Sequence, residues 1–83
     1  MAKMIDKFTK RPDLEPGHYR HYKGGEYTVL MIACDEATHK WLVIYEALYG
    51  HPGVPKIWAR YYDSFVENVT VDGRSIPRFV RVS

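Results

Sequence analysis

Two turn signals separate runs of strand-forming residues, and this arrangement constrains the fold more than any other feature of the sequence. Gly24-Gly25 is the first signal and Asp72-Gly73 is the second. Two-residue connections of these kinds are typical of β-hairpins, because both central positions of a type I′ turn need a positive φ angle. The sequence therefore predicts two antiparallel hairpins. Their strands are expected at His18–Lys23, Glu26–Cys34, Asn68–Val71 and Arg74–Val82.

The first hairpin can be paired in two ways. A two-residue loop pairs Lys23 with Glu26, whereas a three-residue loop pairs Lys23 with Tyr27. The two registers place different side chains on each face of the hairpin. The sequence does not decide between them.

The last hairpin has one self-consistent register. Pairing around Asp72-Gly73 brings apolar residues together and opposite charges together. The expected pairs are Val71 with Arg74, Val69 with Ile76, and Glu67 with Arg78. Pro77 cannot donate a ladder hydrogen bond, so it is expected at a sheet edge or a bulge.

Two further strands and one helical turn complete the expected elements. Trp41–Tyr45 and Lys56–Tyr61 are predicted strands, and Tyr62–Glu67 has the spacing of a helical turn. Polar or proline-containing loops are expected at Asp35–Lys40 and His51–Pro55. Glu46–Gly50 either extends the third strand or bends away from it.

The expected fold class is mainly β. It is a small antiparallel, strongly bent sheet or a partly open SH3-like barrel with one short helical turn. The second and third strands are apolar on both faces, with Val29 and Met31 expected on one face and Leu30 and Ile32 on the other. Because a solvated face normally alternates with polar residues, something must cover the second face. The candidates are the amino-terminal segment with Phe8, the helical turn, or another subunit.

Length and composition indicate a single small domain. Hydrophobic residues make up 46% of the 83 residues, which excludes a disordered chain. Met1–Glu15 is expected to be a flexible or loosely docked tail, or a short helix, and residues 16–83 a single small β domain. No apolar run is long enough for a membrane helix, so no membrane partner is expected. One cysteine, Cys34, excludes an internal disulfide and favours the cytoplasm.

Separate sequence blocks resemble a known family, the bacterial domain of unknown function 1653. The resemblance covers about residues 16–80, and Tyr61 departs from it because proline is expected there. It implies a compact β-rich bacterial domain and carries no established activity, cofactor or catalytic residue. The matching blocks are Gly17–Gly24, Tyr27, Val29, Val43–Gly50, Trp58–Arg60, Phe65–Glu67 and Pro77–Phe79.

These features predict a non-catalytic binding module. Aromatic side chains interleaved with cations are typical of surfaces that bind a protein segment or single-stranded nucleic acid. A formal net charge of +2 does not by itself indicate nucleic acid. The same rings are also what a small core needs. The candidate binding residues are Tyr19, His21, Lys23, Tyr45, Tyr49, Trp58 and Arg60.

Two other function classes stay open. The two-faced apolar strands favour a homodimer, and His21, Lys23 and Arg60 are the acid–base and anion-holding groups of a lower-ranked enzyme hypothesis. No catalytic residue and no cofactor is predicted. No metal site is predicted either, because His18 and His21 supply two ligands where a structural zinc needs four.

Overall fold

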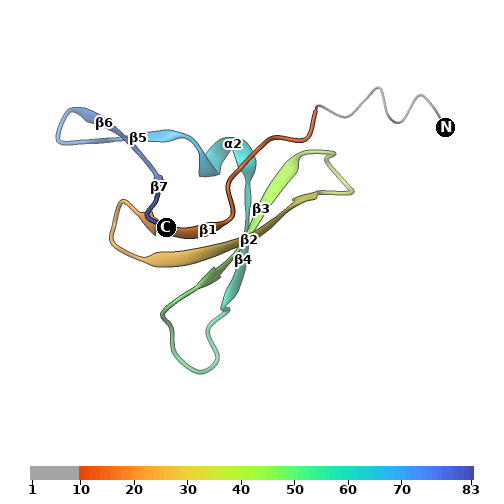
Figure 1. Cartoon of the computed structure of the whole chain (residues 1–83), viewed down its shortest axis with the longest axis horizontal. Coiled ribbons are helices and arrows are strands. Elements are labelled where there is room, and N and C mark those ends of the chain that lie inside the picture. Colours follow the sequence, from red (N-terminus) through yellow and green to blue (C-terminus); the bar gives the residue numbers. More distant parts are fainter. Residues whose placement is uncertain (1–9) are drawn as a thin grey trace.

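The strand-forming runs assemble into one curved sheet and one separate hairpin (Figure 1). The computed structural model describes residues 10–83. The elements are β1 (Gly17–His21), β2 (Glu26–Cys34), β3 (Trp41–Ala47), β4 (Ile57–Tyr61), α2 (Tyr62–Phe65), β5 (Asn68–Val71), β6 (Arg74–Pro77) and β7 (Phe79–Arg81).

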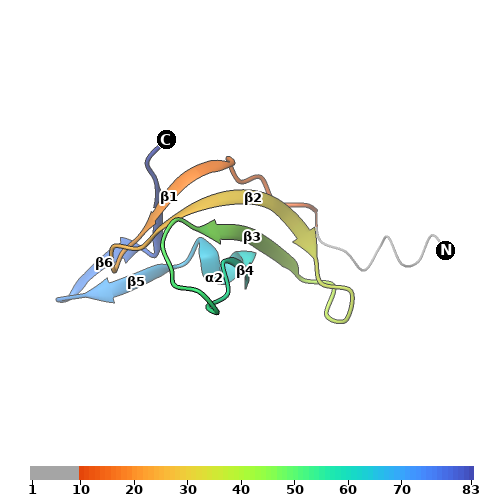
Figure 2. The ribbon, with the colours of Figure 1, turned by 90° about the horizontal axis from the view of Figure 1, so that it is seen from below.

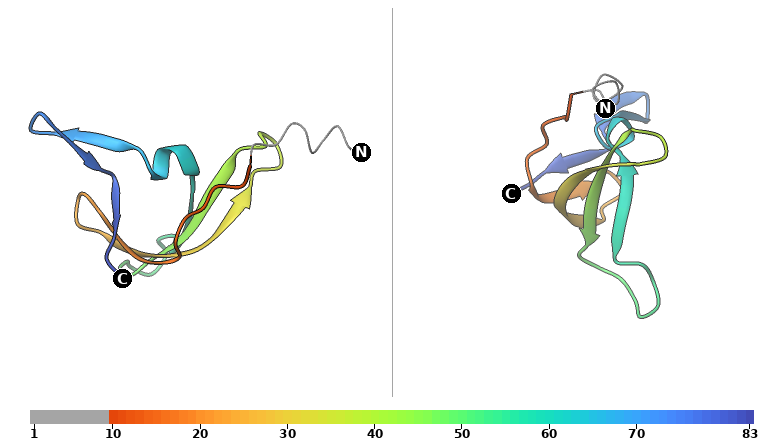
Figure 3. Two further views of the ribbon diagram at one scale, coloured as in Figure 1. Left: turned by 45° about the horizontal axis from the view of Figure 1, so that its top comes forward. Right: turned by 90° about the vertical axis from the view of Figure 1, so that its right-hand side faces the viewer.

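The main sheet is antiparallel, with strand order β4-β3-β2-β1-β7. Strands β5 and β6 form a two-stranded hairpin of their own. Figure 2 shows β1, β2 and β3 arching over α2, and Figure 3 shows the β5–β6 hairpin projecting away from the sheet. The expected mainly β, strongly bent sheet with one helical turn is therefore confirmed. The strands of residues 10–83 do not close into a barrel.

Neither predicted register of the first hairpin is correct. Tyr19 pairs with Tyr27, and the turn consists of Tyr22–Gly24. The backbone N–H of His21 donates to the carbonyl of Gly25 (2.7 Å) and closes this turn. The observed register places Tyr19 and Tyr27 together on the face that packs against the rest of the protein, which the two turn-based registers did not take into account.

The register of the last hairpin is confirmed. Val69 pairs with Ile76, and the carboxylate of Glu67 lies 2.8 Å from the guanidinium of Arg78. Asp72 and Gly73 both have positive φ angles, as a type I′ turn requires. The predicted long final strand is wrong in one respect: it is interrupted at Arg78, and β7 leaves the hairpin to pair with β1.

A β-bulge changes which residues of β2 face inward. Val29 pairs with Tyr45 but Met31 pairs with Ile44, so Leu30 is the extra residue. Val29 and Ile32 consequently share the face that contacts α2, called here the inner face, and Met31 lies on the opposite, outer face. The expected alternation, with Val29 and Met31 on one face, is wrong because a bulge reverses the order of faces beyond it.

The core lies between the inner face and α2. Its buried members are Tyr19, Val29, Val43, Tyr45, Phe65 and Phe79. The Phe65 and Phe79 rings stack with centroids 4.0 Å apart, and Tyr19 and Tyr45 meet Phe65 edge-on. The helical turn therefore covers the inner face, while Met31 on the outer face is 56% exposed.

The segment before β1 contacts the domain at several of its described residues. Residues 10–16 contain no helix or strand, Leu14 packs against the core, and the Tyr19 hydroxyl donates to the Glu15 carbonyl (2.5 Å). Phe8, named above as part of a candidate cover for the second face of the sheet, lies outside the described residues. Within residues 10–83, no helix has the length and apolar character needed to cross a lipid bilayer.

Candidate functional site

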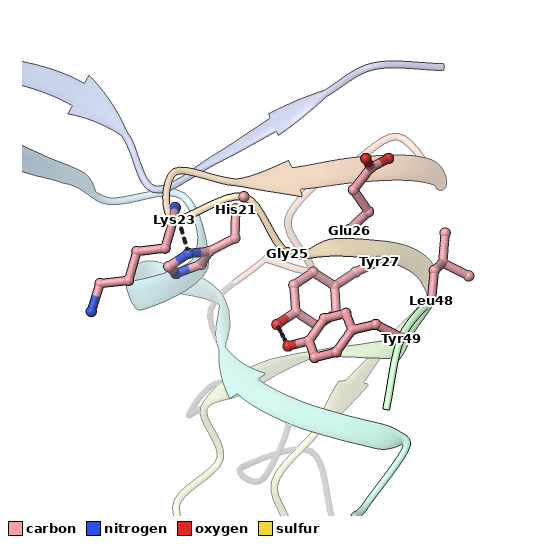
Figure 4. Close-up of a pocket in the computed structure, with 8 residues that line it drawn as sticks. His21, Lys23, Gly25, Glu26, Tyr27, Leu48 and Tyr49 are labelled. Atoms are coloured by element: carbon pink, nitrogen blue, oxygen red, sulfur yellow. Dashed lines mark hydrogen bonds between the residues drawn. The ribbon is translucent and has the colours of Figure 1, made fainter. Parts of the chain in front are cut away.

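An open cavity of about 790 Å³ lies between the β1–β2 turn and the segment after β3. We call it the hairpin pocket. Figure 4 shows His21 and Lys23 on one side of a pair of tyrosines, with Glu26 and Leu48 on the other. The lining residues are His21, Lys23, Gly24, Gly25, Glu26, Tyr27, Leu48 and Tyr49.

A hydroxyl–hydroxyl hydrogen bond joins Tyr27 and Tyr49 at the centre of the hairpin pocket. Burial, followed by this bond, raises the pKa of Tyr27, so its phenol stays neutral at physiological pH. Gly25 leaves room for this pair, because a Cβ there would lie 3.1 Å from the Tyr49 ring and 3.2 Å from the Tyr27 hydroxyl, and the two side chains would have to shift slightly. Tyr49 is 56% exposed.

His21 sits in a positively charged environment. Burial lowers the pKa of its imidazole, and Arg60, Arg78 and Lys23 lower it further, in that order. Its ring meets the Phe79 ring edge-on, with centroids 4.9 Å apart. Its Nδ1 accepts a hydrogen bond from the Lys23 backbone N–H (3.1 Å), so the neutral imidazole has a defined partner.

The two arginines near His21 are held by helix α2. Arg60 donates to the Ser64 hydroxyl (2.9 Å), and its guanidinium carbon lies 5.9 Å from the centre of the Phe79 ring. Arg78 donates to the Ser64 carbonyl (3.0 Å) and to the Glu67 carboxylate. Since both arginines are fixed on one helical turn, the positive charge beside His21 has a fixed position.

The predicted binding residues separate into three groups. Tyr19 and Tyr45 are buried in the core, where their rings contact Phe65. His21, Lys23 and Tyr49 line the hairpin pocket, and Arg60 lies next to it through Phe79. Lys23 belongs to the turn, so the strand expected over His18–Lys23 is wrong at its end. Trp58 lies on the inner face of edge strand β4, opposite Tyr45, and is 40% exposed.

Sequence reasoning missed three residues of this site. Tyr27 pairs with Tyr49, Gly25 admits both rings, and Arg78 adds charge near His21. Gly25 belongs to the turn signal and Tyr27 lies two residues after it, but the sequence pattern at these positions indicates only a hairpin. Arg78 was correctly paired with Glu67, but nothing in the sequence indicated its proximity to His21.

The lowered pKa of His21 predicts a pH dependence of stability. Because the unfolded chain binds the proton more readily, the free energy of unfolding should fall as pH decreases from the unfolded pKa of about 6.5 through the lower folded pKa, and stay high above that window. Urea unfolding at a series of pH values would measure it. In His21→Gln this part of the slope should disappear, whereas in His51→Gln, an exposed loop position, it should remain. An unchanged slope in His21→Gln would contradict the assignment.

The remaining side chains of interest concern metal binding, His18 and the free cysteine. Among residues 10–83, no three side chains of the His, Cys, Asp and Glu types gather as metal ligands would. The His18 imidazole lies 2.5 Å from the Glu26 carboxylate. Cys34 is half-buried at the end of β2, and its thiol points to the carbonyl of Asp35 (3.8 Å).

Comparison with known proteins identifies a family and a similar crystal structure. Residues 17–81 match the profile of a protein family of unknown function, DUF1653. The chain belongs to the DUF1653 family. A crystal structure of a DUF1653 protein from Bordetella bronchiseptica is similar to this DUF1653 domain, with 37% sequence identity and a TM-score of 0.76. The similarity covers 84% of this chain and 88% of that one. The comparison with curated proteins gave no match.

Proposed function

We propose that this DUF1653 domain is a non-catalytic binding module whose hairpin pocket and neighbouring cations bind single-stranded nucleic acid. The proposal rests on one observation: Lys23 lines the same pocket as the exposed Tyr49, and Arg60 lies beside that pocket over the Phe79 ring that His21 contacts. Phosphate groups would bind to the cations and a base would stack on the ring. A single nucleic-acid strand would therefore use both parts of the surface.

The charges available at the pocket support an anionic ligand. Within residues 10–83, neither Lys23 nor Arg60 lies within ion-pair distance of a carboxylate. Arg78 is already paired with Glu67 and therefore adds less net charge. The Glu26 carboxylate lies near His18 and Arg20 and points away from the tyrosine pair (Figure 4).

A protein segment is the competing ligand of the same module. An acidic peptide would satisfy Lys23 and Arg60 but would leave the face of Tyr49 without a stacking partner. A short oligonucleotide uses both, and stacking on one ring contributes about 1–3 kcal/mol per base. The exposed ring beside the cations therefore favours nucleic acid.

Binding should depend on Tyr49 and Lys23. The isotope-labelled domain would be titrated with short oligouridylate, with oligothymidylate, and with a glutamate-rich peptide of equal charge, and amide shifts followed by NMR. We expect Tyr49→Ala to weaken oligonucleotide binding about 5- to 150-fold, the equivalent of one stacked base. Lys23→Ala should weaken it and reduce its salt dependence.

The matched control is Arg74→Ala, which removes an exposed cation from the start of β6 in the other hairpin and should leave the affinity unchanged. If the acidic peptide bound more tightly than the oligonucleotides, the ligand would be a protein segment instead of nucleic acid. Unshifted amides at His21, Lys23 and Tyr49 with every ligand would refute a binding role for the pocket. A cytoplasmic location is part of the proposal, supported by the single unpaired Cys34.

A further inference from the structure

A second cavity, of about 440 Å³, lies where α2, the start of β3 and the segment before β1 meet. We call it the Trp41 pocket. Three aromatic rings and a proline form its apolar walls, and they come from three separate parts of the chain. The lining residues are Lys10, Pro12, His39, Lys40, Trp41, Tyr61, Tyr62 and Asp63.

The described part of the amino-terminal segment is held beside the Trp41 pocket. Leu14 packs against the core, and the Arg81 side chain donates a hydrogen bond to the Pro16 carbonyl (3.1 Å). From these contacts the chain runs past α2 towards the turn between β2 and β3 (Figure 1), and Lys10 and Pro12 line the pocket. The residues that precede Lys10 are therefore joined to the chain at the pocket itself.

Phe8 is near enough in the sequence to reach the Trp41 pocket. It lies two residues before Lys10, and two residues of chain span at most about 7 Å. It is also the only aromatic residue among residues 1–9. A phenylalanine ring stabilises a fold when it leaves water and packs edge-on or offset against other rings. The pocket offers three such rings within this reach of the chain.

A free anionic ligand suits the Trp41 pocket less well than a tethered apolar side chain. The Lys40 ammonium already lies over the Tyr61 ring, 5.3 Å from its centre. The Asp63 carboxylate also lines the pocket and would repel an anion. A side chain joined to the pocket by a short tether has an effective concentration on the order of millimolar, with which a weakly bound free ligand must compete.

We propose that the Trp41 pocket is the docking site of this chain's own amino-terminal segment, with the Phe8 ring as its occupant. Docking extends the apolar core beyond α2, because Tyr62 both lines the pocket and packs against the core. The proposal goes beyond nucleic-acid binding and is independent of it, since the Trp41 pocket and the hairpin pocket share no lining residue.

NMR and thermal unfolding of the full chain test the docking. We expect NOEs between the ring protons of Phe8 and the indole protons of Trp41. Phe8→Ser should shift the Trp41 indole N–H resonance, because the ring current of Phe8 is lost. It should also lower the melting temperature by about 5 °C or more, because apolar packing is lost. Phe8→Leu should recover most of that melting temperature, since leucine keeps an apolar side chain in the pocket.

The matched control is Val54→Ser, which removes an exposed apolar side chain from the loop between β3 and β4. It should change neither the Trp41 resonance nor the melting temperature, and amide shift dispersion would show that each variant is folded. If Phe8→Ser behaves like Val54→Ser and the parent chain shows no NOE between Phe8 and Trp41, the proposal is overturned.

Two other occupants of the Trp41 pocket are outcomes of the same measurements. If oligouridylate added to the parent chain abolishes the NOEs between Phe8 and Trp41, the nucleic acid takes the pocket and the proposal is wrong. In a mixture of labelled and unlabelled chains, NOEs that join Phe8 of one chain to Trp41 of another would assign the pocket to a second copy and would equally overturn it. NOEs confined to one chain support docking of its own segment.

Discussion

Replacing Phe65 with alanine is expected to lower the free energy of unfolding by about 3–5 kcal/mol, the range for removing a buried phenylalanine. Phe65 is 1% exposed, stacks on Phe79 and contacts Tyr19 and Tyr45. It is the buried residue of α2, so its loss also releases the turn that holds Arg60 and Arg78. The total free energy of unfolding of a small domain is about 5–15 kcal/mol, so urea unfolding should show a large loss of stability.

The neighbouring residue provides the control for this change. Val66 is exposed, and Val66→Ala should change the free energy of unfolding by no more than about 0.5 kcal/mol. If Phe65→Ala costs less than about 1 kcal/mol, the inner face does not depend on α2 as its packing indicates.

The second large effect is expected at Arg78. Arg78→Ala should destabilise the domain by about 2 kcal/mol, because it removes charge-assisted hydrogen bonds to Ser64 and Glu67 at the junction of β6 and β7. Arg78→Lys should recover little of this loss, since one ammonium cannot reproduce the forked donor geometry. Urea unfolding would measure both variants against the parent chain.

Arg78→Ala should also change the titration of His21. Because Arg78 helps to lower the pKa of His21, its removal should raise that pKa, which an NMR titration of the imidazole would detect. Arg74→Ala removes an exposed cation of the same hairpin. It should change neither the free energy of unfolding nor the pKa of His21. An unchanged His21 titration in Arg78→Ala would mean that the charge of Arg78 does not reach the pocket.

The sequence predicted the structure best where strand pairing depends on residues that are close together in the chain. The β5–β6 register followed from an Asp-Gly turn and from residue pairs on either side of it. The β1–β2 register did not, because packing of Tyr19 and Tyr27 with residues from β3, α2 and β7 selects it. Local turn preference cannot encode contacts with strands far along the chain.

The types of residue in the candidate site were predictable from the sequence, but their positions in the fold were only partly predictable. His21, Lys23, Tyr49 and Arg60 were named from their chemistry, but which tyrosines remain exposed depends on the core. The Tyr45 ring meets the Phe65 and Phe79 rings edge-on, whereas Tyr49, four residues later, lies beyond the end of β3. Burial of this kind follows from the assembled sheet and is not visible in a pattern of rings and cations.

The extra residue in β2 can be removed without exchanging the two faces of the strand. Without Leu30, Met31 would follow Val29 directly and would still face Ile44, and Ile32 would still face Val43. Val29 and Ile32 would stay on the inner face, because deleting the unpaired residue of a bulge leaves a regular ladder. Loss of the codon for Leu30 should therefore be tolerated far better than loss of a codon in a strand without a bulge, where every later side chain changes face.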